Sequence, residues 1–142
     1  MRVHNKLESL VYNAIDLNKE WQNKLKDCSL KGATGIVNYA KEYQTVKIDV
    51  GRQIGKTSLI ARSVNINDVV ITYNQESASH LLKKISSFNI FGVSVFNASC
   101  LPECDRNFDT VWIDESKCIK EVDIERIYEI FAGKCKQFVF IG

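Results

Sequence analysis

The chain has 142 residues, of which 45% are hydrophobic and 25% are charged, and its formal net charge is +2. This length accommodates one domain with a hydrophobic core and is too short for two. A net charge so close to zero gives no indication of an extended nucleic-acid-binding surface. No apolar run is long enough to span a bilayer, and the first residues lack the apolar core of a signal peptide. We therefore expect one domain without a membrane partner.

The five cysteines are odd in number and irregular in spacing, which is typical of reduced thiols in a cytosol rather than of a disulfide framework. A zinc site is the alternative, built from Cys100, Cys104, Cys118 and His80. The spacing of Cys100 and Cys104 is irregular for zinc, and no second close pair exists. We therefore expect unligated thiols and a cytoplasmic location, in the host cytoplasm if the protein is viral.

The first 44 residues are expected to form a helical extension. Residues 5–28 carry apolar side chains at helical spacing, and Asn18 is expected to interrupt this helix by capping a second one. The lysines of this region indicate a solvated helix face, with a docking surface for a protein or for nucleic acid as the alternative. After a loop that contains two glycines, Thr34 is expected to cap a short helix over residues 36–43.

Three polar or aromatic side chains at the end of this extension could contact a nucleotide base. Tyr39, Tyr43 and Gln44 lie just before the first strand, where a helix often borders the base of a bound nucleotide. They are candidates to stack on adenine or to bond to it. The alternative, which we favour, is that both tyrosines are half-buried packing residues.

Strands and helices alternate along residues 45–142. The run Val69–Tyr73 is almost continuously β-branched, as expected of a strand that is buried on both faces. Such alternation predicts an α/β fold with three layers and a mostly parallel central sheet. The other expected elements are a strand over 46–50, a helix over 58–64, a helix that opens at 74 and ends over 86–89, a strand over 91–96, an irregular stretch over 97–108, a strand over 108–113, a helix over 122–131 that stops at Gly133, and a strand over 137–141.

A phosphate-binding loop is predicted between the first strand and the helix that follows it. Residues 46–60 read V-K-I-D-V-G-R-Q-I-G-K-T-S-L-I. Amide groups of a tight loop and the N-terminus of a helix both attract phosphate oxygens. Lys56 would reach the outer phosphates, and the Thr57 hydroxyl would bind Mg²⁺. The usual pattern requires glycine at position 50, where this chain has Val50 and places the glycine one residue later. The residues expected to bind the nucleotide are Gly51, Arg52, Gln53, Ile54, Gly55, Lys56, Thr57 and Ser58.

Two consecutive carboxylates form the expected second half of the site. The strand over 108–113 ends in Asp114 and Glu115, which leave it in different directions because side chains alternate along a strand. One carboxylate can hold Mg²⁺ while the other activates a water molecule. In combination with the loop, they predict a three-layer P-loop nucleoside triphosphatase: one domain, residues 1–142, with 1–44 as the extension and 45–142 as the nucleotide-binding core.

Four segments resemble the ATPase domain of terminase large subunits, the viral DNA-packaging motors, and the related superfamily 2 helicases. G-R-Q-I-G-K-T-S is similar to the variant Walker A motif of terminases, which often carries an Arg-Gln pair. F-D-T-V-W-I-D-E-S is similar to their Walker B motif. V-V-I-T-Y-N-Q-E-S-A-S-H-L and K-Q-F-V-F-I-G resemble the strand-helix unit and the strand that surround it. The resemblance covers roughly residues 40–142.

This resemblance implies a role for each residue of the two motifs. Lys56 and Thr57 bind phosphate and Mg²⁺, Asp114 completes the Mg²⁺ shell, and Glu115 is the catalytic base. Arg52 acts in cis on the γ-phosphate; the alternative is that Arg52 is a solvent-exposed loop residue without this role. Gln53 supports the loop backbone. The implied ligands are ATP and Mg²⁺, and the implied partners are double-stranded DNA or a viral protein complex.

The chain also departs from the family. It stops at Gly142, where terminases continue into a coupling motif, and no nuclease domain follows. We therefore expect a minimal ATPase module, or a stand-alone relative with a different role, rather than a complete packaging motor. A trans-acting arginine, if one exists, would be Arg106 or Arg126, and it would require a homo-oligomer.

Three functions are consistent with these features. The first is a DNA-related ATPase that binds and hydrolyses ATP. The second is a regulatory module that binds nucleotide, hydrolyses little of it and docks on a larger protein or nucleic-acid complex. The third is a small-molecule kinase, which the consecutive Asp114 and Glu115 disfavour because a kinase positions an acceptor rather than a hydrolytic water.

Overall fold

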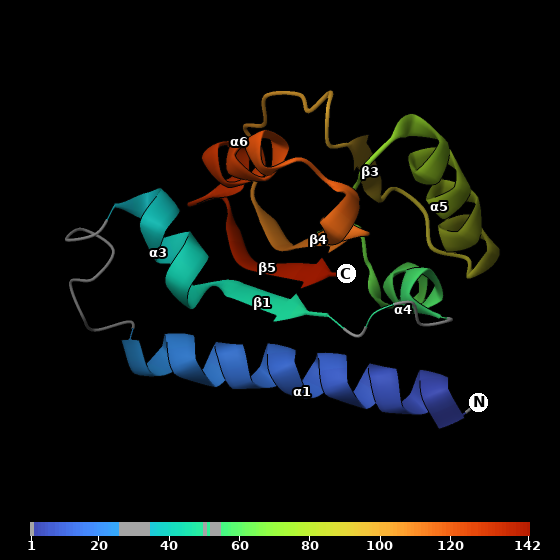
Figure 1. Cartoon of the computed structure of the whole chain (residues 1–142), viewed down its shortest axis with the longest axis horizontal. Coiled ribbons are helices and arrows are strands. Elements are labelled where there is room, and N and C mark those ends of the chain that lie inside the picture. Colours follow the sequence, from blue (N-terminus) through green and yellow to red (C-terminus); the bar gives the residue numbers. More distant parts are fainter. Residues whose placement is uncertain (1, 26–34, 50, 52–54) are drawn as a thin grey trace.

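The computed structural model describes residues 2–25, 35–49, 51 and 55–142, and the side chains from residue 6 onward. It is an α/β structure with one five-stranded sheet and helices on both of its faces (Figure 1). The expected residues Thr34, Val50, Arg52, Gln53 and Ile54 lie outside the described residues. The helices are α1 (Arg2–Leu25), α3 (Ile36–Tyr43), α4 (Lys56–Ser63), α5 (Gln75–Ser87) and α6 (Glu121–Phe131), with a short 3₁₀ turn, η1, at Ser116–Cys118. The strands are β1 (Thr45–Ile48), β2 (Val69–Thr72), β3 (Ser94–Asn97), β4 (Phe108–Asp114) and β5 (Cys135–Ile141).

The sheet is parallel throughout and has the strand order β1-β5-β4-β2-β3. The last strand of the chain, β5, therefore lies between β1, which precedes the predicted phosphate loop, and β4, which ends in Asp114 (Figure 1). Because all five strands run the same way, their carboxyl ends lie along one edge of the sheet. The loop after β1 and the carboxylates after β4 consequently share that edge.

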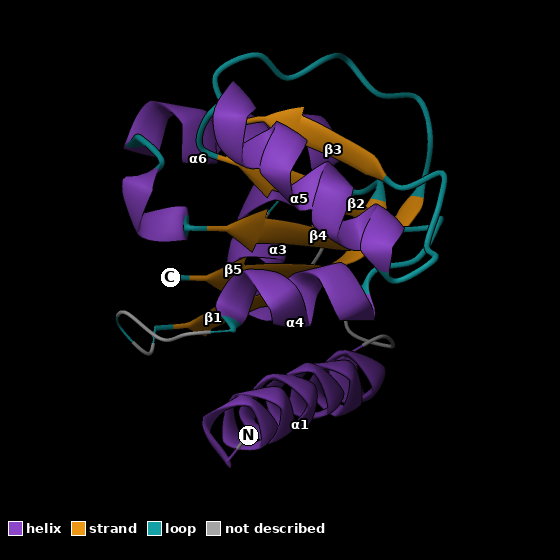
Figure 2. Cartoon of the chain, turned by 90° about the vertical axis from the view of Figure 1, so that its right-hand side faces the viewer, coloured by secondary structure: helices purple, strands orange, loops and turns teal. Residues whose placement is uncertain are grey.

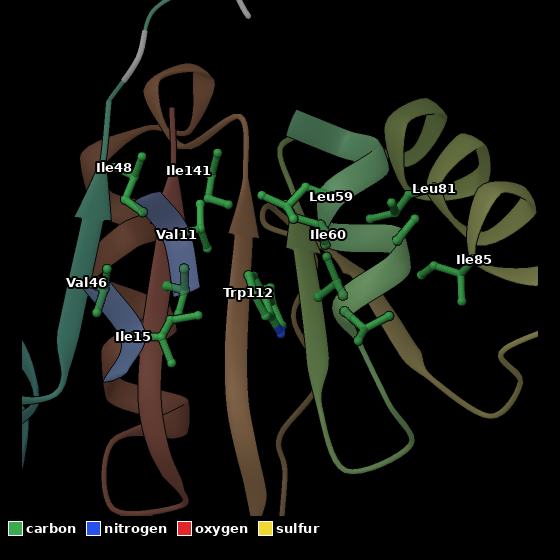
Figure 3. Packing of buried hydrophobic residues seen from close by; sticks show 14 of the residues in the cluster. Val11, Ile15, Val46, Ile48, Leu59, Ile60, Leu81, Ile85, Trp112 and Ile141 are labelled. Atoms are coloured by element: carbon green, nitrogen blue, oxygen red, sulfur yellow. The ribbon is translucent and has the colours of Figure 1, made fainter. Parts of the chain in front are cut away.

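Each face of the sheet is covered by its own set of helices. The first face packs against α1, α4 and α5, with Val70, Trp112 and Val139 pointing toward them (Figure 3 shows this cluster). The opposite face packs against α3 and α6. Neighbouring strand residues contribute to opposite clusters, so the strands are apolar on both sides, as the β-branched run of β2 predicts.

Helix α1 is continuous, so the expected break at Asn18 is wrong (Figure 2). The Asn18 side chain donates to the Tyr43 carbonyl at 2.9 Å and accepts from the amides of Gln22, at 2.7 Å, and Gln137, at 2.9 Å. The amide of Asn18 therefore fastens α1 to the rest of the fold instead of capping a helix. Figure 2 shows α1 below α4 in the view, and both helices pack on the same face of the sheet.

The third strand is shorter and later than expected. It begins at Ser94 rather than at residue 91. Gly92 has a φ of 79°, in the left-handed region, and Phe91 is 69% exposed. A turn at Gly92 therefore separates the end of α5 from the strand, and the first residues of the expected run do not join the sheet.

The helix before β1 is packed as we expected. Tyr39 and Gln44 are buried, and the rings of Tyr39 and Tyr43 lie 5.3 Å apart between centroids. Gln44 also holds the amino end of β1 in place, because its carbonyl accepts from the amide of Phe138 on β5 at 2.7 Å. These contacts favour packing over the alternative of an adenine contact.

Candidate functional site

The first part of the site is the start of α4. Gly55 precedes the helix with a φ of 100°, a left-handed conformation that glycine adopts without steric cost. Its carbonyl accepts the first helical bond from the amide of Leu59 at 2.8 Å. The turn at Gly55 places Lys56 and Thr57 in the first turn of α4, where backbone N–H groups have no partner within the helix. This end of α4 is therefore suited to an anion.

The second part of the site is the end of β4, and one hydrogen bond joins it to the first. The Thr57 hydroxyl donates to Oδ2 of Asp114 at 3.1 Å, across 57 residues of sequence. Asp114 is 4% exposed, so its carboxylate is largely withdrawn from solvent. The two residues that the sequence assigns to a Mg²⁺ site are thus in contact.

Burial determines the electrostatics of Asp114. Loss of solvent raises its pKa from 3.8 to about 6, and the neighbouring charge of Glu115 contributes to the increase. The hydrogen bonds from Thr57 and from the Glu115 amide, and the charge of Lys56, act in the opposite direction. A cation that binds next to this carboxylate would stabilise its charged form.

Glu115 leaves the strand by a left-handed turn, with a φ of 51° and a ψ of 46°. Its own amide donates to Oδ1 of Asp114 at 3.0 Å. A non-glycine residue in this conformation is uncommon, and such strain is often retained at functional sites. The turn separates the two carboxylates: Asp114 is buried, whereas Glu115 is only half-buried and faces the cavity described next.

A cavity of about 710 Å³ lies at this edge of the sheet. The predicted residues Gly51, Gly55 and 56–58 line it together with Asp114 and Glu115. A smaller hollow of about 280 Å³ shares Thr57, Asp114 and Glu115, and it extends toward the start of α5. The structure therefore brings together all the predicted site residues that it describes.

Sequence reasoning missed four residues of the cavity. They are Lys84 from α5, Lys117 and Cys118 from η1, and Gly142 after β5. No motif connects these positions with the loop, because only the packing of α5 and η1 brings them to this edge. The proximity of residues 117 and 118 to the Asp-Glu pair was the one available signal.

The lysine of the loop is bonded within its own loop. Nζ of Lys56 donates to the carbonyl of Gly51 at 2.5 Å. The amide of Gly51 donates to Oδ1 of Asp49 at 3.2 Å, and Oδ2 of Asp49 pairs with Nζ of Lys117 at 2.7 Å. The Lys117 bond and the Gly51 amide lower the pKa of Asp49. Asp49 thus connects the loop with the turn after β4.

Two other predicted residues lie away from this cavity. Arg106 donates to the carbonyl of Ile66 at 2.6 Å and covers the ring of Phe108, at the amino end of β4 and not at its carboxyl end. Arg126 lies on α6 and is exposed. Neither residue lines the cavity of its own chain. Either arginine could therefore act only on the cavity of a second copy of the chain.

The donor atoms at the site fit Mg²⁺. This ion prefers oxygen ligands and commonly takes only one or two protein groups, with phosphates and water completing an octahedron. Thr57 and Asp114 offer a hydroxyl and a carboxylate in direct contact. Within the described residues no group of three His, Cys, Asp or Glu side chains could form an all-protein metal site.

Comparison with protein-family models finds no match to this chain, and comparison with curated proteins finds none either. In the part of the chain that the structure describes, no helix combines the length and the apolar character needed to cross a membrane.

Proposed function

We propose that the chain binds a nucleoside triphosphate with Mg²⁺ and hydrolyses it. The observation that carries this proposal is the 3.1 Å bond between Thr57 and Asp114. It joins the N-terminus of the helix after a Gly-Lys-Thr loop to a buried carboxylate at the end of another strand. Such a contact is what a site for a phosphate-bound Mg²⁺ ion requires.

Each side chain of the site has a separate role in the proposed reaction. The first amides of α4 and the ammonium group of Lys56 bind phosphate oxygens, which requires Lys56 to release the Gly51 carbonyl. Thr57 and Asp114 would hold Mg²⁺, whose charge would stabilise the phosphate oxygens. Glu115 is half-buried at the cavity wall, and it orients and deprotonates the attacking water.

The resemblance of the two motifs to terminases and helicases extends this proposal to a DNA-related ATPase, with ATP as the nucleotide and double-stranded DNA as the partner. The order of the parts supports it: loop, β-branched strand, then a strand that ends in Asp-Glu. Arg52 would act on the γ-phosphate in this scheme.

The test is steady-state phosphate release from ATP, with and without single- and double-stranded DNA. Glu115→Gln should lower the rate by at least about 100-fold and leave ATP binding intact, because it removes the base and keeps the side-chain shape. Lys56→Ala should abolish binding. Lys83→Ala, which changes an exposed lysine outside the cavity, is the matched control. An unchanged rate for Glu115→Gln would contradict the mechanism, and a rate that DNA does not alter would contradict the DNA partner.

A second candidate function rests on the outer surface of α1. Leu10, Leu17 and Trp21 are 47%, 68% and 49% exposed and lie on one side of the helix. Exposed apolar stripes of this kind are typical of docking surfaces. They favour a nucleotide-dependent binding module that docks on a larger protein. Stoichiometric ATP binding without phosphate release, with DNA present, would support this function over hydrolysis.

A further inference from the structure

Lys117 is the cavity residue whose surroundings the proposed reaction does not explain. It lies in the 3₁₀ turn directly after the Asp-Glu pair, and the left-handed conformation of Glu115 directs the chain into that turn. Its side chain lines the same cavity as Lys56. Among the described residues, Lys117 forms an ion pair with Asp49, which follows β1 two strands away in the sheet.

The Asp49–Lys117 ion pair is formed by two exposed groups. The N–O distance is 2.7 Å, but the side chains are 61% and 58% exposed for Lys117 and Asp49. Ion pairs this open to water contribute little to the stability of a fold, because solvent screens them and both side chains lose entropy. The pair can therefore be exchanged for a stronger partner at low cost.

A bound polyphosphate would be such a partner. Phosphate oxygens carry full charges and form short, charge-assisted bonds with ammonium groups. The cavity presents the carboxylates of Asp114 and Glu115 and three lysines, Lys56, Lys84 and Lys117. Three cations from three separate elements exceed what a monophosphate needs and could each contact a different phosphate of a triphosphate.

We infer that Lys117 is a second phosphate-binding lysine, which Asp49 holds at the cavity until a nucleoside triphosphate takes it over. This inference rests on the proposed function and adds the ligand class: the site distinguishes the triphosphate from nucleotides with fewer phosphates. Asp49 has a part in the exchange because its other oxygen accepts the amide of Gly51 in the phosphate loop. Transfer of Lys117 to the ligand leaves that loop contact in place.

The experiment measures dissociation constants of Mg-ATP and AMP by calorimetry for the wild-type chain, Lys56→Ala and four further variants. Lys117→Gln removes the cation, and Lys120→Gln is its control, because Lys120 is an exposed lysine three residues later and lies outside the cavity. Asp49→Asn removes the charge of Asp49 but keeps an Oδ1 acceptor for the Gly51 amide. The fourth variant combines Asp49→Asn with Lys117→Gln, and melting curves verify that each variant is folded.

Lys117→Gln should weaken Mg-ATP binding about tenfold and leave AMP binding unchanged, the size of effect expected for one charge-assisted hydrogen bond. Asp49→Asn should tighten Mg-ATP binding several-fold, because Lys117 no longer has to leave a partner. In the double variant this gain should be absent, since the two changes act on one contact.

The inference is overturned if Lys117→Gln binds Mg-ATP as well as Lys120→Gln does. It is also overturned if Asp49→Asn tightens binding equally without Lys117, because the gain would then come only from a lost negative charge. If Lys56→Ala binds as the wild-type chain does, the proposed function fails and this inference fails with it. If Lys56→Ala loses Mg-ATP binding while Lys117→Gln binds normally, the proposed function stands and only the role of Lys117 is contradicted.

Discussion

Asp114 illustrates the conflict between stability and chemistry at a single residue. Its pKa is raised from 3.8 to about 6 by burial, so at neutral pH the folded state holds a charge that solvent would stabilise better. Between about pH 4 and pH 6 the folded state binds more protons than the unfolded state. The free energy of unfolding contributed by this group therefore falls as the pH rises through that window.

Asp114→Asn should consequently stabilise the protein at pH 7. A shift of roughly two pKa units corresponds to about 2–3 kcal/mol of unfolding free energy, most of which should be absent by pH 4, where the carboxyl is protonated in the folded state. Urea denaturation at the two pH values measures the difference. Asp105→Asn, at an exposed position of the loop before β4, serves as control. A gain of equal size at both pH values would contradict this origin of the effect.

The cysteines differ in their surroundings, and this allows a chemical test of the cavity. Cys118 is exposed and lines the cavity, Cys100 is exposed but does not line it, and Cys135 is buried with its pKa raised to about 12 by loss of solvent. Only a thiolate reacts readily with iodoacetamide, so Cys135 should stay unmodified. Mg-ATP should slow the modification of Cys118 and leave the rate at Cys100 unchanged.

Mass spectrometry of the digested protein gives the rate at each cysteine. Equal protection of Cys100 and Cys118 would indicate a general tightening of the fold rather than occupation of the cavity. An unchanged rate at Cys118 in the presence of saturating Mg-ATP would place the nucleotide elsewhere.

At the scale of the elements, a small group of side-chain amides attaches α1 to the sheet. Gln137 on β5 is 1% exposed, and its Nε2 donates to Oδ1 of Asn18 and to the carbonyl of Ile15. Asn18→Ala removes an acceptor from this buried amide and should lower the unfolding free energy by about 1–3 kcal/mol. Asn13→Ala, on the exposed side of the same helix, should change it by less than about 0.5 kcal/mol. Urea denaturation of both variants tests the prediction, and equal losses would refute it.

The sequence predicts those elements whose signal is local. The β-branched run of β2 and the period of the helices follow from side chains that are neighbours in the chain, and the structure has both. Asn74 illustrates the same point, because its side chain caps α5 by accepting from the Ser77 amide at 2.8 Å. A parallel sheet then places Asp114 and the loop at one edge without further information.

Features that depend on tertiary contacts are not predictable in this way. Asn18 has the chemistry of a helix cap, but its amide is used by Tyr43 and Gln137, which lie far away in the sequence. Lys84 and Lys117 have no local pattern that distinguishes them from other surface lysines. They belong to the cavity only because α5 and η1 pack beside the loop.

At the scale of the whole molecule, the site is assembled from segments that are far apart in the chain. The loop follows β1, the carboxylates follow β4, and β5 lies between these strands in the sheet. A ligand that contacts Lys56, Asp114 and Glu115 therefore connects the segments after β1 and β4, across the end of β5. Unfolding of any part of this edge would release the ligand. Ligand binding should therefore raise the stability of the whole domain.

Mg-ATP should accordingly raise the melting temperature of the whole domain in one transition. At 100 times the dissociation constant, a ligand that binds only the folded state adds about 2.7 kcal/mol, which corresponds to roughly 8–10 °C for a chain of this size. Differential scanning calorimetry measures the shift. Lys56→Ala should abolish it, because the variant loses the phosphate contact, whereas Lys83→Ala should retain it. A shift that survives in Lys56→Ala would mean that ATP binds outside the loop, and two separate transitions would mean that the edge of the sheet unfolds independently of α1.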